Sequence, residues 1–177
     1  MDVSIREILN PSPADLTLRD ESFVVDTVLV LHASDNRITY TFKPVPPYRK
    51  TYPSEQDGET LYPGGSERTA FIAYAGGTRA GRILLKKAWN NLAYIDDLCV
   101  ESDLRGQGIG SRLLACADEW ARRNHLPGIM LETQHNNAAA CRLYARCGYT
   151  LCGFNTHLYQ GIPVARDEIA LFWHKTL

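Results

Sequence analysis

The chain has 177 residues, of which 45% are hydrophobic and 22% are charged, and its formal net charge is −1. This is the composition of an ordinary globular domain that can bury a core without disulfide staples. The near-neutral charge offers no basic field for nucleic acid or anionic lipid, no apolar run is long enough to span a membrane, and the first ten residues lack the apolar core of a signal peptide. We therefore expect one cytoplasmic domain over residues 1–177, with no nucleic-acid partner and no membrane partner.

Strand signals dominate the first part of the chain. Alternating apolar and polar residues predict strands at residues 3–8 and 38–42. Residues 14–31 mix helix and strand signals, because the polar run 20–22 could open a short helix while β-branched runs follow it. Residues 43–65 contain five prolines, so we expect a long irregular segment of the kind that forms lids or binding loops.

Three consecutive strands are predicted next, at residues 69–74, 82–89 and 92–100. A glycine-rich hairpin connection separates the first two, and Asn90-Asn91 turns the chain into the third. We expect these strands to form an antiparallel meander.

Helices and strands then alternate. A helix is predicted by apolar residues at helical spacing, namely Ile109, Leu113, Leu114, Ala117, Trp120 and Ala121. The next strand, residues 129–133, should run parallel to 92–100 because a helix separates them. A second helix should be capped by Asn136-Asn137 and end before Gly148. Further strands are expected around three apolar runs, residues 149–151, 158–159 and 169–173.

The five cysteines and five histidines are scattered along the chain. An odd cysteine count without a Cys-x-x-Cys pair favours reduced thiols, packed as small apolar residues. The spacing of these side chains does not fit a zinc site. We therefore predict no metal site.

Three alternating glycines stand where the first helix must begin, in Arg105-Gly106-Gln107-Gly108-Ile109-Gly110. Glycine lets the backbone adopt unusual dihedral angles, and the first N–H groups of a helix have no intrahelical partner. Together with the helix dipole they form an anion site suited to a pyrophosphate. The lysine of a Walker loop is missing, and the glycine spacing differs from that of a dinucleotide-binding fingerprint. An ordinary turn before an amphipathic helix is the alternative.

This Arg-x-x-Gly-x-Gly pattern resembles the coenzyme A loop of the GCN5-related N-acetyltransferases (GNAT). Residues 137–149 resemble the second signature of that family, Asn-x-x-Ala-x-x-x-Tyr-x-x-x-Gly-aromatic. The resemblance implies an α/β fold, the GNAT acyl-CoA N-acyltransferase fold. Such a fold has a central, mostly antiparallel sheet with a splayed parallel pair of strands, flanked by helices. It also implies acetyl-CoA as cosubstrate and no metal.

Within this family the chain resembles the streptothricin acetyltransferases, on residues 94–98, 131–134 and 169–173. Those enzymes use acetyl-CoA to acetylate an amine of the β-lysine moiety of streptothricin antibiotics. The likeness covers Leu92 to Trp173, and little matches before Thr69. The chain departs from the family pattern at two positions, because His135 stands in place of an aspartate and Cys99 in place of an alanine.

The resemblance implies how acetyl-CoA would bind. Main-chain groups from Leu98 to Val100 would hold the pantetheine arm like an added strand, and an N–H near Val100 would meet the thioester oxygen. The diphosphate would lie on the helix N-terminus, with a charge-assisted contact from Arg105. Tyr144 would protonate the departing thiolate, with a core tyrosine as the alternative. The cofactor-binding residues expected are Leu98, Cys99, Val100, Arg105, Gly106, Gln107, Gly108, Ile109, Gly110, Ser111, Asn137 and Tyr144.

The other partner would be a small cationic amine. An alkyl ammonium with a pKa of about 10.4 must lose a proton, which costs about 4–5 kcal/mol at pH 7. Asp96 and Asp97 should point to opposite faces of their strand unless a bulge intervenes. We favour Asp96 as the catalytic carboxylate because it would share a face with Leu98 and Val100, and Glu132 is the second candidate. Recognition of the ammonium without proton transfer is an equal alternative for both, while Asp97 is expected to be solvated or to face a helix.

Aromatic and acidic residues could also attract the amine. The tyrosines in and near the proline-rich segment, Tyr40, Tyr48, Tyr52 and Tyr62, could stack on it. The acidic residues Glu55, Asp57, Glu59 and Glu67 could attract it, or form a solvated acidic loop. The three tryptophans, Trp89, Trp120 and Trp173, are expected in the core. Acetylation of a polyamine, an aminoglycoside or a peptide amine, and a coenzyme A-binding sensor without catalysis, remain alternatives, and a homodimer is an assembly to consider.

Overall fold

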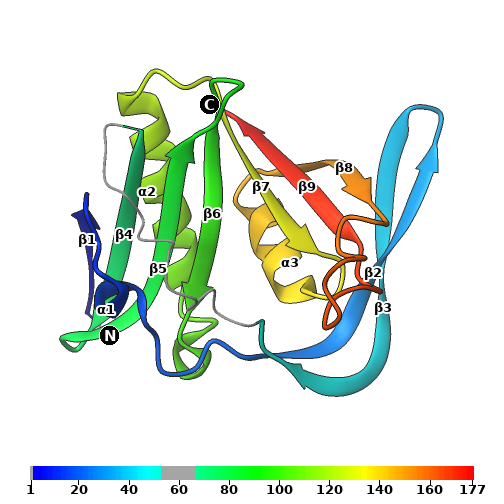
Figure 1. Cartoon of the computed structure of the whole chain (residues 1–177), viewed down its shortest axis with the longest axis horizontal. Coiled ribbons are helices and arrows are strands. Elements are labelled where there is room, and N and C mark those ends of the chain that lie inside the picture. Colours follow the sequence, from blue (N-terminus) through cyan, green and yellow to red (C-terminus); the bar gives the residue numbers. More distant parts are fainter. Residues whose placement is uncertain (1, 53–66) are drawn as a thin grey trace. The chain divides into compact units, whose positions relative to one another are not determined.

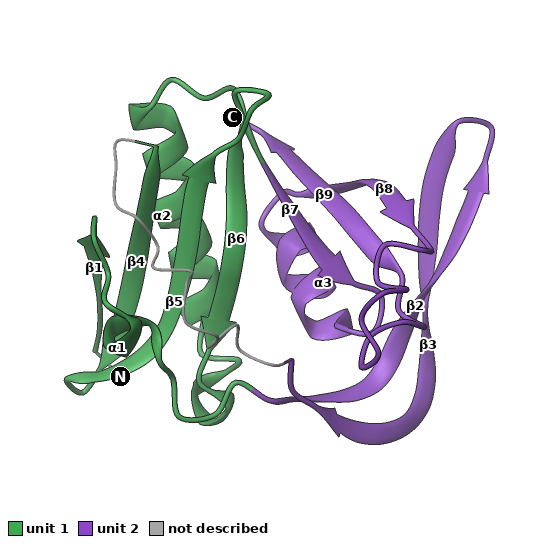
Figure 2. Cartoon of the chain, in the orientation of Figure 1, with its two compact units in different colours: residues 1–21, 53–129, 177 green, residues 22–52, 130–176 purple. Residues whose placement is uncertain are grey.

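A computed structural model of the chain describes residues 2–52 and 67–177 (Figure 1). The described residues divide into two compact units (Figure 2). Unit 1 contains residues 2–21, 67–129 and 177, and unit 2 contains residues 22–52 and 130–176. We describe each unit by itself.

The strands of unit 1 form an antiparallel sheet in the order β1 (Val3–Ile8), β4 (Arg68–Ala75), β5 (Thr78–Lys87) and β6 (Ala93–Val100). The turn between β4 and β5 uses Gly76 and Gly77, with φ values of +56° and +83° that glycine adopts without strain. The predicted meander and the predicted first strand are confirmed.

Helix α2 (Ile109–Arg123) covers one face of this sheet (Figure 1). Its buried residues are those of the predicted apolar stripe: Ile109, Leu113, Leu114, Ala117, Trp120 and Ala121. Each large apolar side chain buried in this way stabilises the fold by about 1.5–3 kcal/mol. The chain enters α2 from β6 through the short 3₁₀ helix η1 (Ser102–Leu104).

Unit 2 contains a long two-stranded ribbon, β2 (Phe23–Ser34) and β3 (Arg37–Lys50), which are antiparallel. Its other strands lie in the order β7 (Gly128–Gln134), β9 (Ala170–Thr176) and β8 (Thr150–Asn155), with β8 antiparallel to β9. Helix α3 (Ala138–Arg146) packs on β9, where the ring centroids of Tyr144 and Trp173 are 6.1 Å apart. The first residues of β7 belong to unit 1.

The prediction of an irregular segment at residues 43–65 is wrong for residues 43–50, which form the second half of β3. A two-stranded ribbon tolerates proline because each strand has an unpaired edge, where a missing N–H costs nothing. Pro44 pairs with Thr27 of β2, and the register shifts next to this pair, so that residues 45–47, with Pro46 and Pro47, fall in an irregularity of the ribbon. Residues 53–66, with Tyr62 and three of the four predicted acidic residues, lie outside the described part of the chain.

Three other expectations have clear outcomes. The ambiguous residues 14–31 contain the short helix α1 (Pro13–Leu16) and most of β2. The strand predicted at 158–159 is wrong, because the Ile162 N–H donates to the Tyr159 carbonyl at 2.8 Å and closes a turn. Trp120 and Trp173 are buried as predicted, but Trp89 is 98% exposed at the turn between β5 and β6.

Within residues 2–52 and 67–177, no helix is long and apolar enough to cross a membrane. The same residues contain no group of three His, Cys, Asp or Glu side chains placed to hold a metal ion.

Candidate functional site

The glycine turn predicted to bind a diphosphate begins α2 in unit 1. Gly106 and Gly108 have φ values of +76° and +83°, and Gly108 is the N-cap residue of the helix. No described side chain caps this helix end, and a Cβ added to either glycine would meet no described heavy atom within 4 Å. The turn therefore presents uncapped N–H groups at the positive end of a helix dipole, an arrangement that suits an anionic group.

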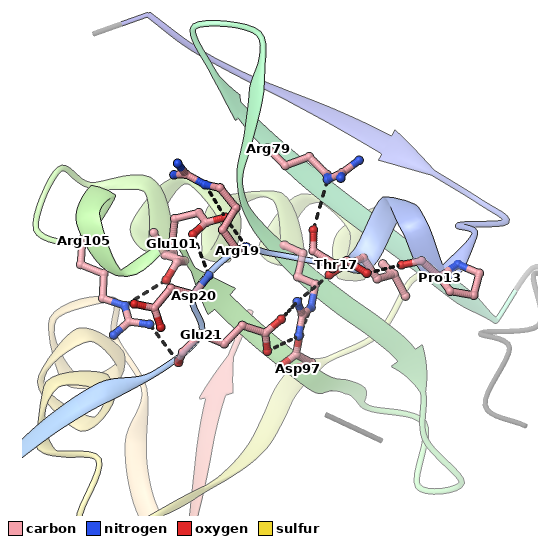
Figure 3. A network of polar contacts seen from close by, with 12 residues as sticks. Pro13, Thr17, Arg19, Asp20, Glu21, Arg79, Asp97, Glu101 and Arg105 are labelled. Atoms are coloured by element: carbon pink, nitrogen blue, oxygen red, sulfur yellow. Dashed lines mark hydrogen bonds and ion pairs between the residues drawn. The ribbon is translucent and has the colours of Figure 1, made fainter. Parts of the chain in front are cut away.

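The side chain of Arg105 holds this turn to its surroundings in unit 1. Its Nε donates to the carbonyl of Val100 at 2.9 Å, and its Nη2 donates to the carbonyl of Glu21 at 3.1 Å. These hydrogen bonds link the end of β6, the turn and the N-terminal segment (Figure 3). The predicted contact of Arg105 with a diphosphate stays a prediction.

A buried carboxylate braces the same region. Glu101, whose side chain is 2% exposed, accepts hydrogen bonds from the main-chain N–H groups of Arg19 at 2.7 Å and Asp20 at 3.2 Å (Figure 3). Asp20 in turn accepts a hydrogen bond from the Ser102 hydroxyl at 2.7 Å. These contacts fix the segment before β2 to the residues that lead into the glycine turn.

Strand β6 carries a bulge at Asp96. Leu84 and Leu85, adjacent on β5, pair with Asp97 and Ile95, so that Asp96 is an extra residue inserted in β6. A bulge of this kind re-aims the side chains around it.

Both aspartates lie on the same face of the unit 1 sheet. Asp96 forms an ion pair with Lys86 and Asp97 forms one with Arg82, each at 2.6 Å. Lys86 and Arg82 are four residues apart on a regular strand and therefore share a face. We expected the two aspartates on opposite faces unless a bulge intervenes, and the structure contains this bulge, so the alternation that would place Asp96 on the face of Leu98 and Val100 does not hold.

Asp97 belongs to an ion-pair network, and its side chain is 34% exposed. Arg82 also donates to the Leu16 carbonyl at 2.6 Å and to a Glu21 carboxylate oxygen at 3.0 Å. Burial raises the pKa of Asp97, and the charge of Arg82 opposes this. Burial works to lower the pKa of Arg82, but the Glu21 hydrogen bond and the Asp97 charge raise it above its ordinary value. The network ties the segment before β2 to the unit 1 sheet.

The end of β6, from Leu98 to Val100, is the predicted pantetheine site. Gly81 of β5 pairs with Val100, and a Cβ at Gly81 would lie 2.8 Å from the Cys99 carbonyl oxygen and 3.3 Å from Leu113. This glycine lets β5, β6 and α2 approach closely. Burial raises the pKa of the Cys99 thiol to about 12, so it stays protonated and unreactive at neutral pH.

In unit 2, Asn137 and Tyr144 belong to α3. The Asn137 side-chain oxygen caps the helix by accepting from the Ala140 N–H at 3.2 Å, which confirms the predicted cap. Tyr144 is 6% exposed, and its ring packs against Trp173 and Tyr149. Tyr144 therefore lies in the aromatic core of unit 2, and its predicted role as a proton donor stays a prediction.

Glu132 on β7 is held by a tyrosine that the sequence does not single out. The Tyr159 hydroxyl donates to Glu132 Oε1, and Gln134 Nε2 donates to the Tyr159 oxygen at 3.2 Å. Glu132 and Gln134 alternate along β7 and share a face. Burial, followed by the neighbouring Glu132 carboxylate, raises the pKa of Tyr159, so its hydroxyl keeps its proton at neutral pH.

A second carboxylate of unit 2, Glu168, already binds an ammonium group. Glu168 is 6% exposed, accepts from the Tyr52 hydroxyl at 2.6 Å and forms an ion pair with Lys50. The Lys50 ammonium lies 4.8 Å from the centroid of the Tyr52 ring. The Tyr52 hydroxyl also meets Asn136, whose amide donates to the Tyr48 hydroxyl at 3.4 Å. A carboxylate and an aromatic face of this unit thus contact the Lys50 amine, while burial lowers the pKa of Lys50.

His135, where the resemblance implied an aspartate, holds together three segments of unit 2. Its Nδ1 accepts from the Ile169 N–H at 3.0 Å, its own N–H donates to the Ile169 carbonyl, and its carbonyl accepts from the Leu29 N–H at 2.9 Å. Burial, followed by the charge of Lys50, lowers the pKa of His135. The imidazole is therefore neutral and bonds to the residue before β9, while the main-chain carbonyl of His135 bonds to β2.

Sequence reasoning found part of this cluster. Tyr48 and Tyr52 were predicted to meet a cation, whereas Tyr40 packs on Trp173 at 5.9 Å. Tyr159 and Glu168 were missed because each bonds to residues far away in the chain. The alternation of Glu132 and Gln134 along one strand was the only local signal.

Comparisons with known proteins place the chain in a family. The chain matches the model of the Acetyltransferase (GNAT) family over residues 35–149. Streptothricin acetyltransferase A of Bacillus subtilis (strain 168) is 37% identical over 161 residues, which are 90% of this chain and 92% of that protein.

Two solved structures resemble the whole chain. One is a candidate streptothricin acetyltransferase from Bacillus anthracis in complex with acetyl coenzyme A, with a TM-score of 0.87, 39% identity and coverage of 100% of this chain and 99% of that one. The other is a nourseothricin acetyltransferase, with a TM-score of 0.80, 30% identity and coverage of 98% of each chain. These matches confirm the predicted α/β fold class. The chain is an N-acetyltransferase and belongs to the acetyltransferase (GNAT) family.

Proposed function

We propose that this N-acetyltransferase transfers the acetyl group of acetyl-CoA to an amine of the β-lysine moiety of a streptothricin-type antibiotic, and so confers resistance. The names of its relatives support the substrate class. The structural observation that carries the proposal is the cluster of carboxylates and tyrosines in unit 2. In this cluster Glu168 and the Tyr52 ring contact the Lys50 amine, and Tyr159 holds Glu132.

Acetyl-CoA, when bound, supplies the activated acyl group. The uncapped start of α2 fits its diphosphate, which would accept hydrogen bonds from N–H groups between Gly106 and Ser111. The main chain from Leu98 to Val100 would bind the pantetheine arm, with Asn137 as a further contact. Arg105 would hold the glycine turn in place, and its positive charge would attract the diphosphate.

Transfer forms a C–N bond and breaks the C–S bond of the thioester, while the amine loses a proton and the thiolate gains one. We assign Glu132 to bind the ammonium and receive its proton, because Glu132 forms no ion pair with any described residue. Asp96, which the sequence favoured, is already neutralised by Lys86 at 2.6 Å. Tyr144 is the proposed proton donor to the thiolate.

The test is a thiol-release assay with acetyl-CoA and a panel of amines: a streptothricin, an aminoglycoside, a polyamine and a lysine peptide. We expect release with the streptothricin at a kcat/KM at least tenfold above that for the other amines, and a product that is heavier by one acetyl group. Mass fragmentation should place the acetyl group on the β-lysine moiety.

A second measurement tests the biological consequence. Expression of the chain in a streptothricin-sensitive bacterium should raise the inhibitory concentration of that antibiotic and leave that of an unrelated antibiotic unchanged. Preference for another amine would reject the proposed substrate. Tight binding of coenzyme A without release on any amine would indicate a sensor.

A further inference from the structure

We propose that Tyr159 is a positioning residue that orients Glu132 for the acceptor amine. This inference rests on the proposed function, because it assigns a role within the amine-binding part of the same site. Tyr159 lies in the connection between β8 and β9, outside both family signatures.

The hydrogen bonds around Tyr159 run in one direction. Gln134 donates to the phenol oxygen, and the phenol donates to Glu132 Oε1. A phenol whose pKa is raised by burial and by the carboxylate keeps its proton, so this direction does not reverse near neutral pH. The hydrogen bond from Tyr159 fixes Oε1 of Glu132. Because the carboxylate is planar and rigid, the direction of its second oxygen, Oε2, is then restricted as well.

The ring of Tyr159 is itself immobilised. It is 7% exposed and packs in a small apolar cluster with Ala165 and Ala170, against Tyr52 and Phe172. The connection that carries Tyr159 is fixed near its other end as well, where Glu168 binds Tyr52 and Lys50. A phenol held at both its ring and its hydroxyl can orient a carboxylate without moving when substrate binds.

The consequence is specific to the amine. Without the phenol hydroxyl, Glu132 rotates among several rotamers and meets the ammonium less often in the productive geometry. The role proposed for Tyr159 concerns the acceptor amine alone, so the binding of acetyl-CoA should not depend on this hydroxyl.

Tyr159→Phe tests the inference, because it removes the hydroxyl and keeps the packed ring. We expect kcat/KM for the amine to fall about 10- to 100-fold, the range of a hydrogen bond to a charged group. The KM for acetyl-CoA should stay within about twofold. Tyr74→Phe, on β4 of unit 1, is the matched control and should leave both constants unchanged.

A double-mutant cycle separates positioning from a general structural effect. If Tyr159 acts through Glu132, Tyr159→Phe should cause no further loss of kcat/KM in a Glu132→Ala background. The urea unfolding midpoints of the four proteins, which need no substrate, should likewise be non-additive. Gln134→Ala, which removes only the donor to the phenol, should give a smaller loss in the same direction.

Three results would overturn the inference. These are additive unfolding midpoints, an unchanged kcat/KM in Tyr159→Phe, or an equal loss of kcat/KM on both Glu132 backgrounds. Failure of the proposed function looks different, since the unmutated protein would then release no thiol with any amine, and the role given to Tyr159 would fall with it.

Discussion

Asp96 and Glu132 differ in the partners that surround them, although both are carboxylates on strands. Lys86 neutralises Asp96, whereas a phenol and no described cation contacts Glu132. We therefore predict that Glu132→Gln lowers kcat/KM for the amine by about 10²- to 10³-fold, within the range of general acid–base catalysis. Asp96→Asn should lower it by less than about tenfold. Steady-state thiol release on both variants checks this, and a larger loss in Asp96→Asn would restore the assignment made from the sequence.

The buried side chain of the single residue Glu101 contributes to the free energy of unfolding. It accepts two main-chain hydrogen bonds, and in Glu101→Gln an amide N–H₂ would face one of these donors. An unsatisfied buried group of this kind costs about 1–3 kcal/mol, so the urea midpoint should fall clearly. Asp103→Asn is the control, because Asp103 contacts the same Arg19 but its side chain is 62% exposed, where an ion pair contributes little. Equal midpoints for the two variants would contradict this account of Glu101.

The sequence allowed single residues to be predicted where the signal is local. Asn137 was recognised as a cap because an N-cap needs only the helix that follows it. The partner of Glu132 could not be found in this way, since Tyr159 lies 27 residues further along the chain. The prediction that Trp89 is in the core was wrong for a related reason. An aromatic residue at the end of a strand can be buried or exposed, and its exposure depends on the turn that follows.

At the scale of elements, the periodicity of apolar residues predicted α2, α3 and most strands. It failed where the local structure depends on how a strand pairs with its neighbour. The bulge at Asp96 arises from the register between β5 and β6, which no single strand specifies. The prolines of β3 suggested a loop, but they are accommodated at the edge of a two-stranded ribbon and at a shift in its register. Both errors concern a neighbouring strand rather than the residues themselves.

His135, which joins two elements of unit 2, gives that unit a predicted pH dependence. Its folded-state pKa lies below the ordinary value of 6.5, so its contribution to stability is present above pH 6.5 and is lost as the pH falls through the folded-state pKa. The urea midpoint should therefore decrease from about pH 7.5 to about pH 5.5, and less steeply in His135→Asn. His125→Asn is the control, because His125 is exposed. Parallel pH profiles for the His135 variant and the unmutated protein would rule out this linkage.

At the scale of the whole molecule, the two units share one interwoven chain. The chain passes between them repeatedly, and β7 begins with residues of unit 1 and continues in unit 2. Neither unit is a continuous segment that could fold before the other is complete. We therefore predict a single calorimetric unfolding transition, as for one cooperative domain. Two resolved transitions would instead define two domains within residues 1–177.

The placement of the three tryptophans has a practical consequence. Trp89 is 98% exposed, Trp120 is 4% exposed in unit 1, and Trp173 is 1% exposed in unit 2. In Trp89→Phe each unit would keep a single indole shielded from water. The fluorescence of that variant, and of versions that also lack one of the other two indoles, would then report the loosening of either half of the enzyme by itself.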